Sequence, residues 1–179
     1  MEGPLRRRRP VVTEFAVERL GITDIDALRA IRLEALRLHP DAFCSDLESA
    51  EAMTSEQWAE GLARGTWFGI RKNGSLIAIG AFTRPASSKL RHPGELSAMY
   101  VRADSRGSGA ADALVRGIVD QVVSEVEQIK LTVNADNAKA IKLYERHGFR
   151  VVGRLPHIIR VADRLYDELV MIRAVSPSD

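Results

Sequence analysis

The spacing of apolar residues changes along the chain, and this change separates predicted strands from predicted helices. Residues 13–20 alternate apolar and polar side chains, which predicts a strand that ends at Gly21. Thr23 then stands where a helix cap is expected, and Pro40 marks the end of that helix. Apolar residues at spacings of three and four form the stripe that this helix would bury, namely Ile25, Leu28, Ile31, Ala35 and Leu38.

The segment that follows is less regular. Residues 39–53 lack a clear period, and we interpret them as a long loop or a broken helix. A short helix is expected after them, from a cap at Thr54 or Ser55 to about Ala63, because both residue types are good helix caps.

Three strands are predicted in the middle of the chain. Residues 66–72 and 75–83 form two apolar runs that are joined at Asn73 and Gly74. An Asn-Gly pair between such runs is a strong signal for a tight hairpin. Residues 95–102 predict the third strand.

Helices and strands alternate in the second half of the chain. Gly107 and Gly109 form a turn, and a helix is expected from there to about Glu127. The later elements are a strand over 129–134, a helix over 137–147 that Gly148 closes, and strands over 149–154 and about 163–173. The order β-α-α-β-β-β-α-β-α-β-β predicts a mixed sheet with helices packed on it. The crossovers around 95–134 and 129–154 require locally parallel strands.

Composition favours one domain with a charged tail. The 179 residues suffice for one domain with a sizeable core, and 45% hydrophobic with 28% charged residues is typical of globular proteins. The formal net charge is +2, but the four arginines at 6–9 contribute +4 and Glu2 −1, which leaves −1 after residue 10. We expect a disordered basic arm over residues 1–10 and a single domain over residues 11–175. A nucleic-acid-binding arm is the alternative, although no aromatic residues are interleaved with the arginines.

The sequence gives no sign of a membrane protein or of an oxidising compartment. It has no run of about 18 apolar residues that could cross a bilayer, and no apolar segment follows the basic N-terminus as in a signal peptide. Cys44 is the only cysteine and cannot form an internal disulfide, so a reducing compartment is expected. We therefore expect a cytoplasmic protein without membrane partners.

The segment V-R-A-D-S-R-G-S-G-A-A, residues 101–111, is the most informative motif. It places a Gly-rich turn between a strand and a helix, where free amides and the helix dipole favour an anion such as a diphosphate. Gly107 and Gly109 permit close backbone approach, and Arg102 and Arg106 add positive charge. A Walker A loop is excluded because no Lys-Ser/Thr follows, and a dinucleotide fingerprint because the third glycine is absent. The alternative is an ordinary strand–helix turn.

A second motif lies in L-T-V-N-A-D-N-A-K-A-I-K-L-Y-E-R-H-G-F, residues 131–149. Asn137 and Tyr144 are seven positions apart on one predicted helix, so they share a face and lie about 10 Å apart along its axis. An amide and a phenol would then project from the same side. The alternative is that Asn137 caps the helix and Tyr144 fills the core.

Together the two segments resemble the GNAT superfamily of acetyl-CoA-dependent N-acetyltransferases. Its pyrophosphate signature, Q/R-x-x-G-x-G/A, corresponds to Arg106, Gly107, Ser108, Gly109, Ala110 and Ala111. Its N-x-x-A-x-x-x-Y-x-x-x-G-F segment corresponds to Asn137, Ala140, Tyr144, Gly148 and Phe149. The resemblance covers about residues 93–155. It implies an α/β (α+β) acyl-CoA N-acyltransferase domain, with a mixed, mostly antiparallel sheet of six to seven strands, a splayed middle pair and about four flanking helices.

The resemblance also implies how the acyl donor binds. Acetyl-CoA would be the cosubstrate, without a metal, and the backbone amides of residues 106–111 would hold its pyrophosphate. The strand 97–101 would splay from the strand 129–134. Main-chain groups of Met99 and Val101 would bond the pantetheine in that gap.

The implied reaction is a direct transfer of acetyl to a primary amine. Asn137 would contact the pantetheine arm, and Tyr144 would protonate the leaving thiolate. The amine must lose a proton before it attacks, and Glu95 is our candidate for the base, with a merely solvated carboxylate as the alternative. A ping-pong route through Cys44 is not expected, because no family motif includes this cysteine.

The acceptor side is less defined. Residues 39–53 would form one wall, and acidic side chains there would attract a cationic amine unless they are only solvated. These side chains are Asp41, Asp46, Glu48 and Glu51. Residues 155–163, expected to join the last two strands, would form the opposite wall, with His157 either near the substrate or simply exposed.

The acceptor class stays open among small amines, amino acids and protein N-termini. A non-catalytic acyl-CoA-binding regulatory domain of the same fold is the alternative to an enzyme, but Tyr144 would have no purpose in it. A homodimer is compatible with the resemblance.

Overall fold

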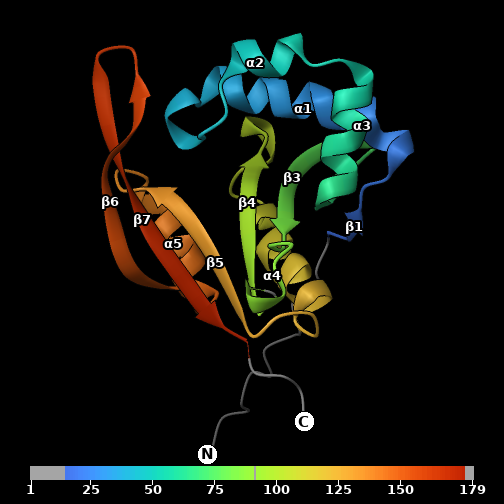
Figure 1. The fold of residues 1–179 in the computed structure, drawn as a ribbon. Coiled ribbons are helices and arrows are strands. Elements are labelled where there is room, and N and C mark those ends of the chain that lie inside the picture. Colours follow the sequence, from blue (N-terminus) through green and yellow to red (C-terminus); the bar gives the residue numbers. More distant parts are fainter. Residues whose placement is uncertain (1–14, 91, 176–179) are drawn as a thin grey trace, which may run out of the picture.

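The computed structural model describes residues 15–90 and 92–175, so the predicted basic arm over residues 1–10 lies outside the described residues. Seven strands form one sheet in the order β1-β2-β3-β4-β5-β7-β6 (Figure 1). The strands are β1 (Val17–Arg19), β2 (Thr66–Lys72), β3 (Ser75–Thr83), β4 (Pro93–Val101), β5 (Gln128–Asn134), β6 (Arg150–Val161) and β7 (Arg164–Ala174). The α-helices are α1 (Ile25–Leu38), α2 (Leu47–Ala52), α3 (Ser55–Arg64), α4 (Ala110–Val122) and α5 (Ala138–Arg146).

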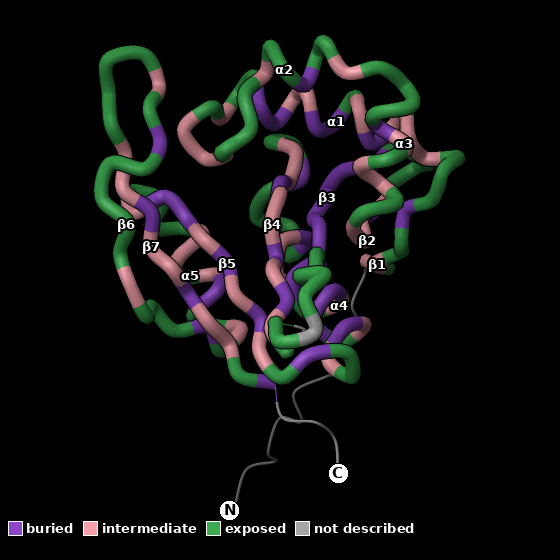
Figure 2. Tube along the Cα trace, viewed as in Figure 1, coloured by how far each residue is buried: buried purple, intermediate pink, exposed green. Residues whose placement is uncertain are grey.

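Strand β3 is covered on both faces. Ile31 of α1 packs in one buried cluster with Ile79, whereas Leu114 of α4 packs in another with Ala78. Seven consecutive residues, 76–82, are therefore buried, as a strand covered on two faces requires (Figure 2). This central strand anchors the helices on either side of the sheet.

The β2–β3 hairpin confirms the sequence prediction in both its strands and its turn. Both strands have the predicted bounds, 66–72 and 75–83. Asn73 and Gly74 have φ values of 51° and 81°, which are the left-handed conformations that a tight two-residue turn needs.

The predicted splaying of the middle strands is confirmed. Strands β4 and β5 pair in parallel over three residue pairs, from Pro93 with Gln128 to Glu95 with Lys130. Beyond that point they diverge (Figure 1), and the remainder of β5 stays paired with β7. Ala98, with φ 54°, adds a bulge to β4 where its register against β3 shifts. The fold class expected from the sequence is therefore correct, with five α-helices in place of about four.

Two predicted helix boundaries are wrong. Thr23 is not the cap of the first helix, because Ile22–Asp24 form a 3-10 turn and Asp24 is the residue that precedes α1. The carboxylate of Asp24 accepts a 2.8 Å hydrogen bond from the backbone N–H of Gly21 and so holds that turn. Helix α4 ends at Val122 instead of about Glu127. The chain turns there so that the Glu127 N–H can bond the His92 carbonyl at 2.8 Å, next to the start of β5.

The last hairpin also differs from the prediction. Strand β6 continues to Val161, so residues 155–163 are mostly strand and not a connecting loop. The register shifts between Leu155 and Ile159, and His157 inside this bulge has φ 55°. The bulge breaks the alternation of side chains, which is why the sequence indicated a loop there.

The two predicted crossovers have different outcomes. The first joins β4 and β5, which are adjacent and parallel as expected. The second joins β5 to β6, but β7 lies between them and is antiparallel to both. Strands β5 and β6 therefore run in the same direction without pairing. The irregular segment 39–53 contains a 3-10 turn and the short helix α2, which agrees with a broken helix.

Gly94 lies within the three-residue parallel pairing, and we predict that Gly94→Ala destabilises the protein. A Cβ at this position would overlap the buried ring of Phe82. Displacing a rigid ring in a packed core lowers the free energy of unfolding by about 1–3 kcal/mol. The matched control is Gly61→Ala in α3, where a Cβ meets no atom within 4 Å. The control should raise stability by about 0.5–1 kcal/mol. Urea denaturation of both variants checks this, and an unchanged Gly94→Ala midpoint would contradict it.

Candidate active site

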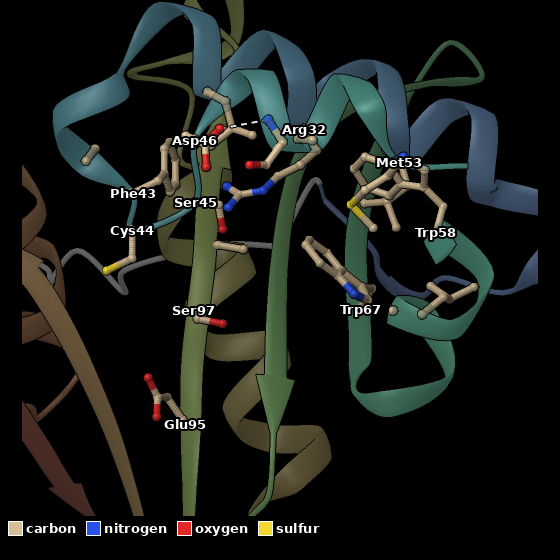
Figure 3. A pocket seen from close by; sticks show the side chains of 18 of the residues that line it. Arg32, Phe43, Cys44, Ser45, Asp46, Met53, Trp58, Trp67, Glu95 and Ser97 are labelled. Carbon is tan, nitrogen blue, oxygen red and sulfur yellow. Dashed lines mark hydrogen bonds between the residues drawn. The ribbon is translucent and has the colours of Figure 1, made fainter. Parts of the chain in front are cut away.

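A cavity of ≈ 630 Å³ opens beside β4 where it leaves β5. Its walls come from α1, the segment before and within α2, α3, and the strands β2, β4, β5 and β7 (Figure 3). Glu95, Ser97 and Ala98 of β4 all line it, so this strand runs along the cavity before it reaches the Gly-rich turn. One of the two walls predicted for the acceptor, residues 39–53, therefore contributes to this cavity.

Two carboxylates mark the strand side of the cavity. Glu95 is half-exposed and forms a 2.9 Å ion pair with Lys130, its partner in the parallel register. Glu168 of β7 is only 4% exposed. Burial raises the pKa of Glu168, the charge of Glu95 raises it further, and a hydrogen bond with the Thr132 hydroxyl acts in the opposite direction. Glu168 is thus poised to accept a proton more readily than an ordinary carboxylate.

Cys44 also lines the cavity, which the sequence did not indicate. It is an exposed residue in the bend before α2. The cavity wall shields the thiol from part of the solvent and so raises its pKa. The nearby charges of Glu168 and Glu95 raise the pKa further, whereas Arg32 lowers it. The thiol is therefore neutral at physiological pH and a weak nucleophile.

A buried arginine contributes the opposite charge. Arg32 of α1 lines the cavity, is 8% exposed, and has its guanidinium 4.5 Å from the ring centroid of Phe43. Burial lowers its pKa to about 10. Sequence reasoning missed this residue, although a signal existed. Arg32 stands four positions from both Leu28 and Leu36, on the stripe that α1 buries.

The predicted acidic wall is present in part. Of the four acidic residues in 39–53, only Asp46 lines the cavity, and it caps α2 by accepting a 2.7 Å bond from the Ser49 N–H. Glu51 instead pairs with Arg37 at 2.7 Å on the exposed side of α1. The wall is therefore built mainly from uncharged groups.

The hairpin predicted as the opposite wall borders an adjoining hollow, which shares Leu36 and residues 43–46 with the first cavity. Residues 158–162 and the segment around Phe43 to Leu47 border this hollow of ≈ 370 Å³. His157 does not line it and is exposed, and its N–H donates a 2.8 Å bond to Asp167. The exposed alternative for His157 agrees with the structure.

The Gly-rich turn has the backbone shape expected for an anion site. Gly107 and Gly109 have φ values of 76° and 92°, and α4 begins immediately after them at Ala110. A Cβ at either glycine would meet no atom within 4 Å, so the turn faces open space that phosphates can enter. Ser108 tightens the turn by donating a 2.6 Å bond to the Ser105 carbonyl.

Arg106 lies across the end of β4. Its Nε donates a 3.0 Å bond to the Val101 carbonyl, and its Nη2 is 2.8 Å from Nε2 of His39. The neighbouring Tyr100 hydroxyl donates a 2.9 Å bond to Glu34 of α1. Glu34 also pairs with Arg102 at 3.1 Å. These contacts connect α1 to the start of the Gly-rich turn.

Met99, on the bulged part of β4, is half-buried and packs against the main core. A Cβ at Gly80 of β3 would come within 2.6 Å of the Met99 sulfur, so the glycine leaves room for that side chain. Met99 and Val101 thus lie on the stretch of β4 that is no longer paired with β5.

Asn137 and Tyr144 take the structural roles that the sequence offered as alternatives. Asn137 caps α5, with Oδ1 accepting a 3.1 Å bond from the Ala140 N–H. Tyr144 is 7% exposed, belongs to the main core, and lies edge-on to Phe149 at 5.8 Å. Burial raises the pKa of its phenol, which stays protonated at physiological pH. The raised pKa keeps the proton on this phenol and makes it a weaker acid than an ordinary tyrosine.

Within the described residues, no helix is long and apolar enough to cross a membrane. In the same part of the chain, no three side chains of His, Cys, Asp or Glu come together as a metal site would need.

Comparisons with known proteins agree on one family. Residues 27–149 match the Acetyltransferase (GNAT) family. The chain is 28% identical over 149 residues to the L-amino acid N-acetyltransferase AaaT of Escherichia coli (strain K12). The aligned region covers 79% of this chain and 86% of that protein.

Solved structures share the fold. An acetyltransferase of the GNAT family from Streptococcus pneumoniae superposes with a TM-score of 0.80 at 20% identity, over 91% of this chain and 100% of that one. The yncA putative acetyltransferase from Salmonella typhimurium, solved with its cofactor acetyl-CoA, gives 0.78 at 20% identity, over 92% and 95%.

The raised pKa of Glu168 generates a prediction about stability. A carboxylate whose pKa is higher in the folded protein stabilises the fold below its unfolded pKa of about 4.3, and this contribution is lost as pH rises through the folded pKa. Glu168→Gln removes the titration and keeps the shape. The melting temperature of Glu168→Gln minus that of the wild type should therefore increase from pH 4 to pH 8. The control is Glu145→Gln on exposed α5, for which the difference should stay flat. A difference that falls with pH for Glu168→Gln would refute the assigned environment.

Proposed function

Because the chain belongs to the Acetyltransferase (GNAT) family and is therefore an N-acetyltransferase, we propose that it transfers acetyl from acetyl-CoA directly to a primary amine held in the cavity beside β4. One observation carries this proposal. A single strand, β4, lines the cavity at Glu95, Ser97 and Ala98 and then leads directly into the Gly-rich turn before α4. Donor and acceptor would meet along that strand.

The donor site is proposed on the residues that match the family signature. The backbone amides of the turn would bind the pyrophosphate, supported by the positive end of α4 and by the open space at both glycines. These residues are Arg106, Gly107, Ser108, Gly109, Ala110 and Ala111. Main-chain groups of Met99 and Val101 and the amide of Asn137 would bind the pantetheine. Arg106 would release the Val101 carbonyl, or share its second lone pair, when that arm binds.

The proposed chemistry removes two protons from the ammonium nitrogen, one before it attacks and one as the amide forms, and delivers one proton to the thiolate. The neutral amine nitrogen forms a bond to the acetyl carbon, and the bond from that carbon to sulfur breaks. Tyr144, buried and protonated, would give its proton to the departing thiolate, and the second proton that the nitrogen loses as the amide forms would restore the phenol. Glu95 would take the proton of the ammonium, directly or through water. Glu168, with its raised pKa, lies on the same side of the cavity and would support that step.

Direct transfer is favoured over a covalent acetyl-cysteine. Cys44 lines the cavity, but burial and two neighbouring carboxylates keep its thiol protonated. A thiol must be deprotonated to attack a thioester efficiently. The amine is therefore the better nucleophile in this cavity once its own proton is removed.

Gly109→Val should weaken acetyl-CoA binding about tenfold or more. A β-branched side chain at φ 92° strains the turn and projects into the space where the phosphates would enter. Calorimetry with acetyl-CoA, free CoA and NAD measures the effect. The matched control is Gly74→Val, which carries the same left-handed strain at the tip of the β2–β3 hairpin. Equal affinities of Gly109→Val and wild type, or wild type that binds neither CoA species, would remove the proposed donor site.

Tyr144→Phe should lower kcat by about 10- to 100-fold and leave the acetyl-CoA Kd nearly unchanged, because it removes a proton donor and keeps the ring in the core. Steady-state release of CoA thiol, with a saturating amine, measures kcat. Tyr166→Phe on β7 is the control for loss of a phenol elsewhere.

Cys44→Ser in the same assay separates the two routes. It should retain most of the turnover, because direct transfer does not use the thiol. Loss of turnover in Cys44→Ser with full turnover in Tyr144→Phe would reverse the assignment of roles.

A further inference from the structure

A buried positive charge without a partner lies in the wall of the cavity. Among the described residues, Arg32 forms no ion pair and no hydrogen bond, and its Nη1 is fully covered. The other arginines of α1 differ, since Arg37 pairs with Glu51 and Arg29 bonds the Glu51 carbonyl. Buried charges are normally paired, because a charge taken out of water loses several kcal/mol of solvation. A missing anion would complete this site.

The protein itself supplies little to compensate Arg32. The ring of Phe43 lies 4.5 Å from the guanidinium and offers a cation–π contact. Burial nevertheless lowers the pKa of Arg32 to about 10, so the surroundings disfavour its charge. Such an arginine contributes little to the stability of the fold, since an apolar residue of similar size at position 32 would stabilise the folded protein more.

A second orphan donor lines the same cavity. The indole Nε1 of Trp58 in α3 is buried and has no hydrogen-bond partner among the described residues. Both unpaired groups in the wall are therefore donors. The ligand that would satisfy them must offer acceptor oxygens.

The charges in the cavity are arranged with opposite signs on different sides. Figure 3 shows Glu95 and Arg32 apart along β4, with Ser97 and Cys44 between them. The Cys44 thiol is influenced by charges of both signs, since Glu168 and Glu95 raise its pKa and Arg32 lowers it, and the capping carboxylate of Asp46 is a further charged group in the lining. A ligand in this space would meet positive charge on one side and negative charge on the other. A zwitterion with a carboxylate close to its amine has that pattern.

We propose that the acceptor is an α-amino acid whose carboxylate is bound by Arg32, with its amine directed toward Glu95 and Glu168. This assignment rests on the proposed function. Arg32 is then a specificity-determining residue, because guanidinium–carboxylate pairing is strong and directional in a desolvated site. The remaining wall selects the side chain. Trp67, Met53 and Leu62 line the cavity and favour an apolar amino acid over a polar one.

The test compares two acceptors that differ only in the carboxylate. Phenylalanine and phenethylamine share one side chain, as do leucine and isoamylamine. Wild-type protein should give a higher kcat/KM for each amino acid than for its decarboxylated amine. Arg32→Met, which keeps the length without the charge, should lose roughly 10- to 100-fold in kcat/KM for the amino acids and change little for the amines. Arg32→Lys should recover part of the loss.

Two controls separate specificity from folding. Arg32→Met should melt no lower than wild type, because it removes an unpaired buried charge. Arg37→Met alters a different α1 arginine that does not line the cavity and should keep the wild-type preference. Calorimetry should give the same acetyl-CoA Kd for all variants.

The possible results are distinguishable. The inference is overturned if Arg32→Met keeps the preference for amino acids, or if its kcat/KM falls equally for amino acids and amines. It is also overturned if the wild type prefers the amines. It is also overturned if wild type binds acetyl-CoA and acetylates neither type. Absence of acetyl-CoA binding would instead remove the proposed function and this inference with it.

Discussion

The short parallel pairing between β4 and β5 is the constraint on which the rest of the site depends. Three residue pairs hold the strands together, and the last of them joins Glu95 to Lys130 through both the register and an ion pair. Backbone groups of a strand need partners, so two strands that separate inside a domain expose edges that a ligand can pair. The cavity, the bulge at Ala98 and the Gly-rich turn all lie along β4 or directly after it, beyond this short pairing.

Local sequence signals predicted the elements well where residues close in the chain determine the backbone conformation. Asn73 and Gly74 define a hairpin, and Asn137 caps α5, because both depend on residues close in the chain. The end of α4 and the length of β6 were predicted poorly. Both are decided by distant partners, namely the His92 carbonyl next to β5 and the long pairing of β6 with β7. Tertiary contacts of this kind leave no periodic trace.

The candidate site also has one part that is local in the sequence and one part that distant segments assemble. The proposed donor residues form contiguous motifs in the sequence, whereas the cavity proposed for the acceptor is assembled from seven separate segments. Glu168 was missed because alternation in β7 does not show which neighbours bury it. Arg32 was visible only as a charged residue on an apolar helical stripe, which a search for catalytic motifs passes over.

Helix α1 has a consequence for how such a protein can change during evolution. Its Arg32 faces the cavity, whereas Glu34, two positions later, bonds Tyr100 and Arg102 beside the Gly-rich turn. One helix therefore carries two positions, two residues apart, that contact different parts of the proposed site. If Arg32 binds the acceptor as proposed, substitutions there would alter acceptor specificity, whereas substitutions of Glu34 would disturb the contacts beside the proposed donor turn. A change of acceptor would then need a point mutation and no rebuilding of the donor half.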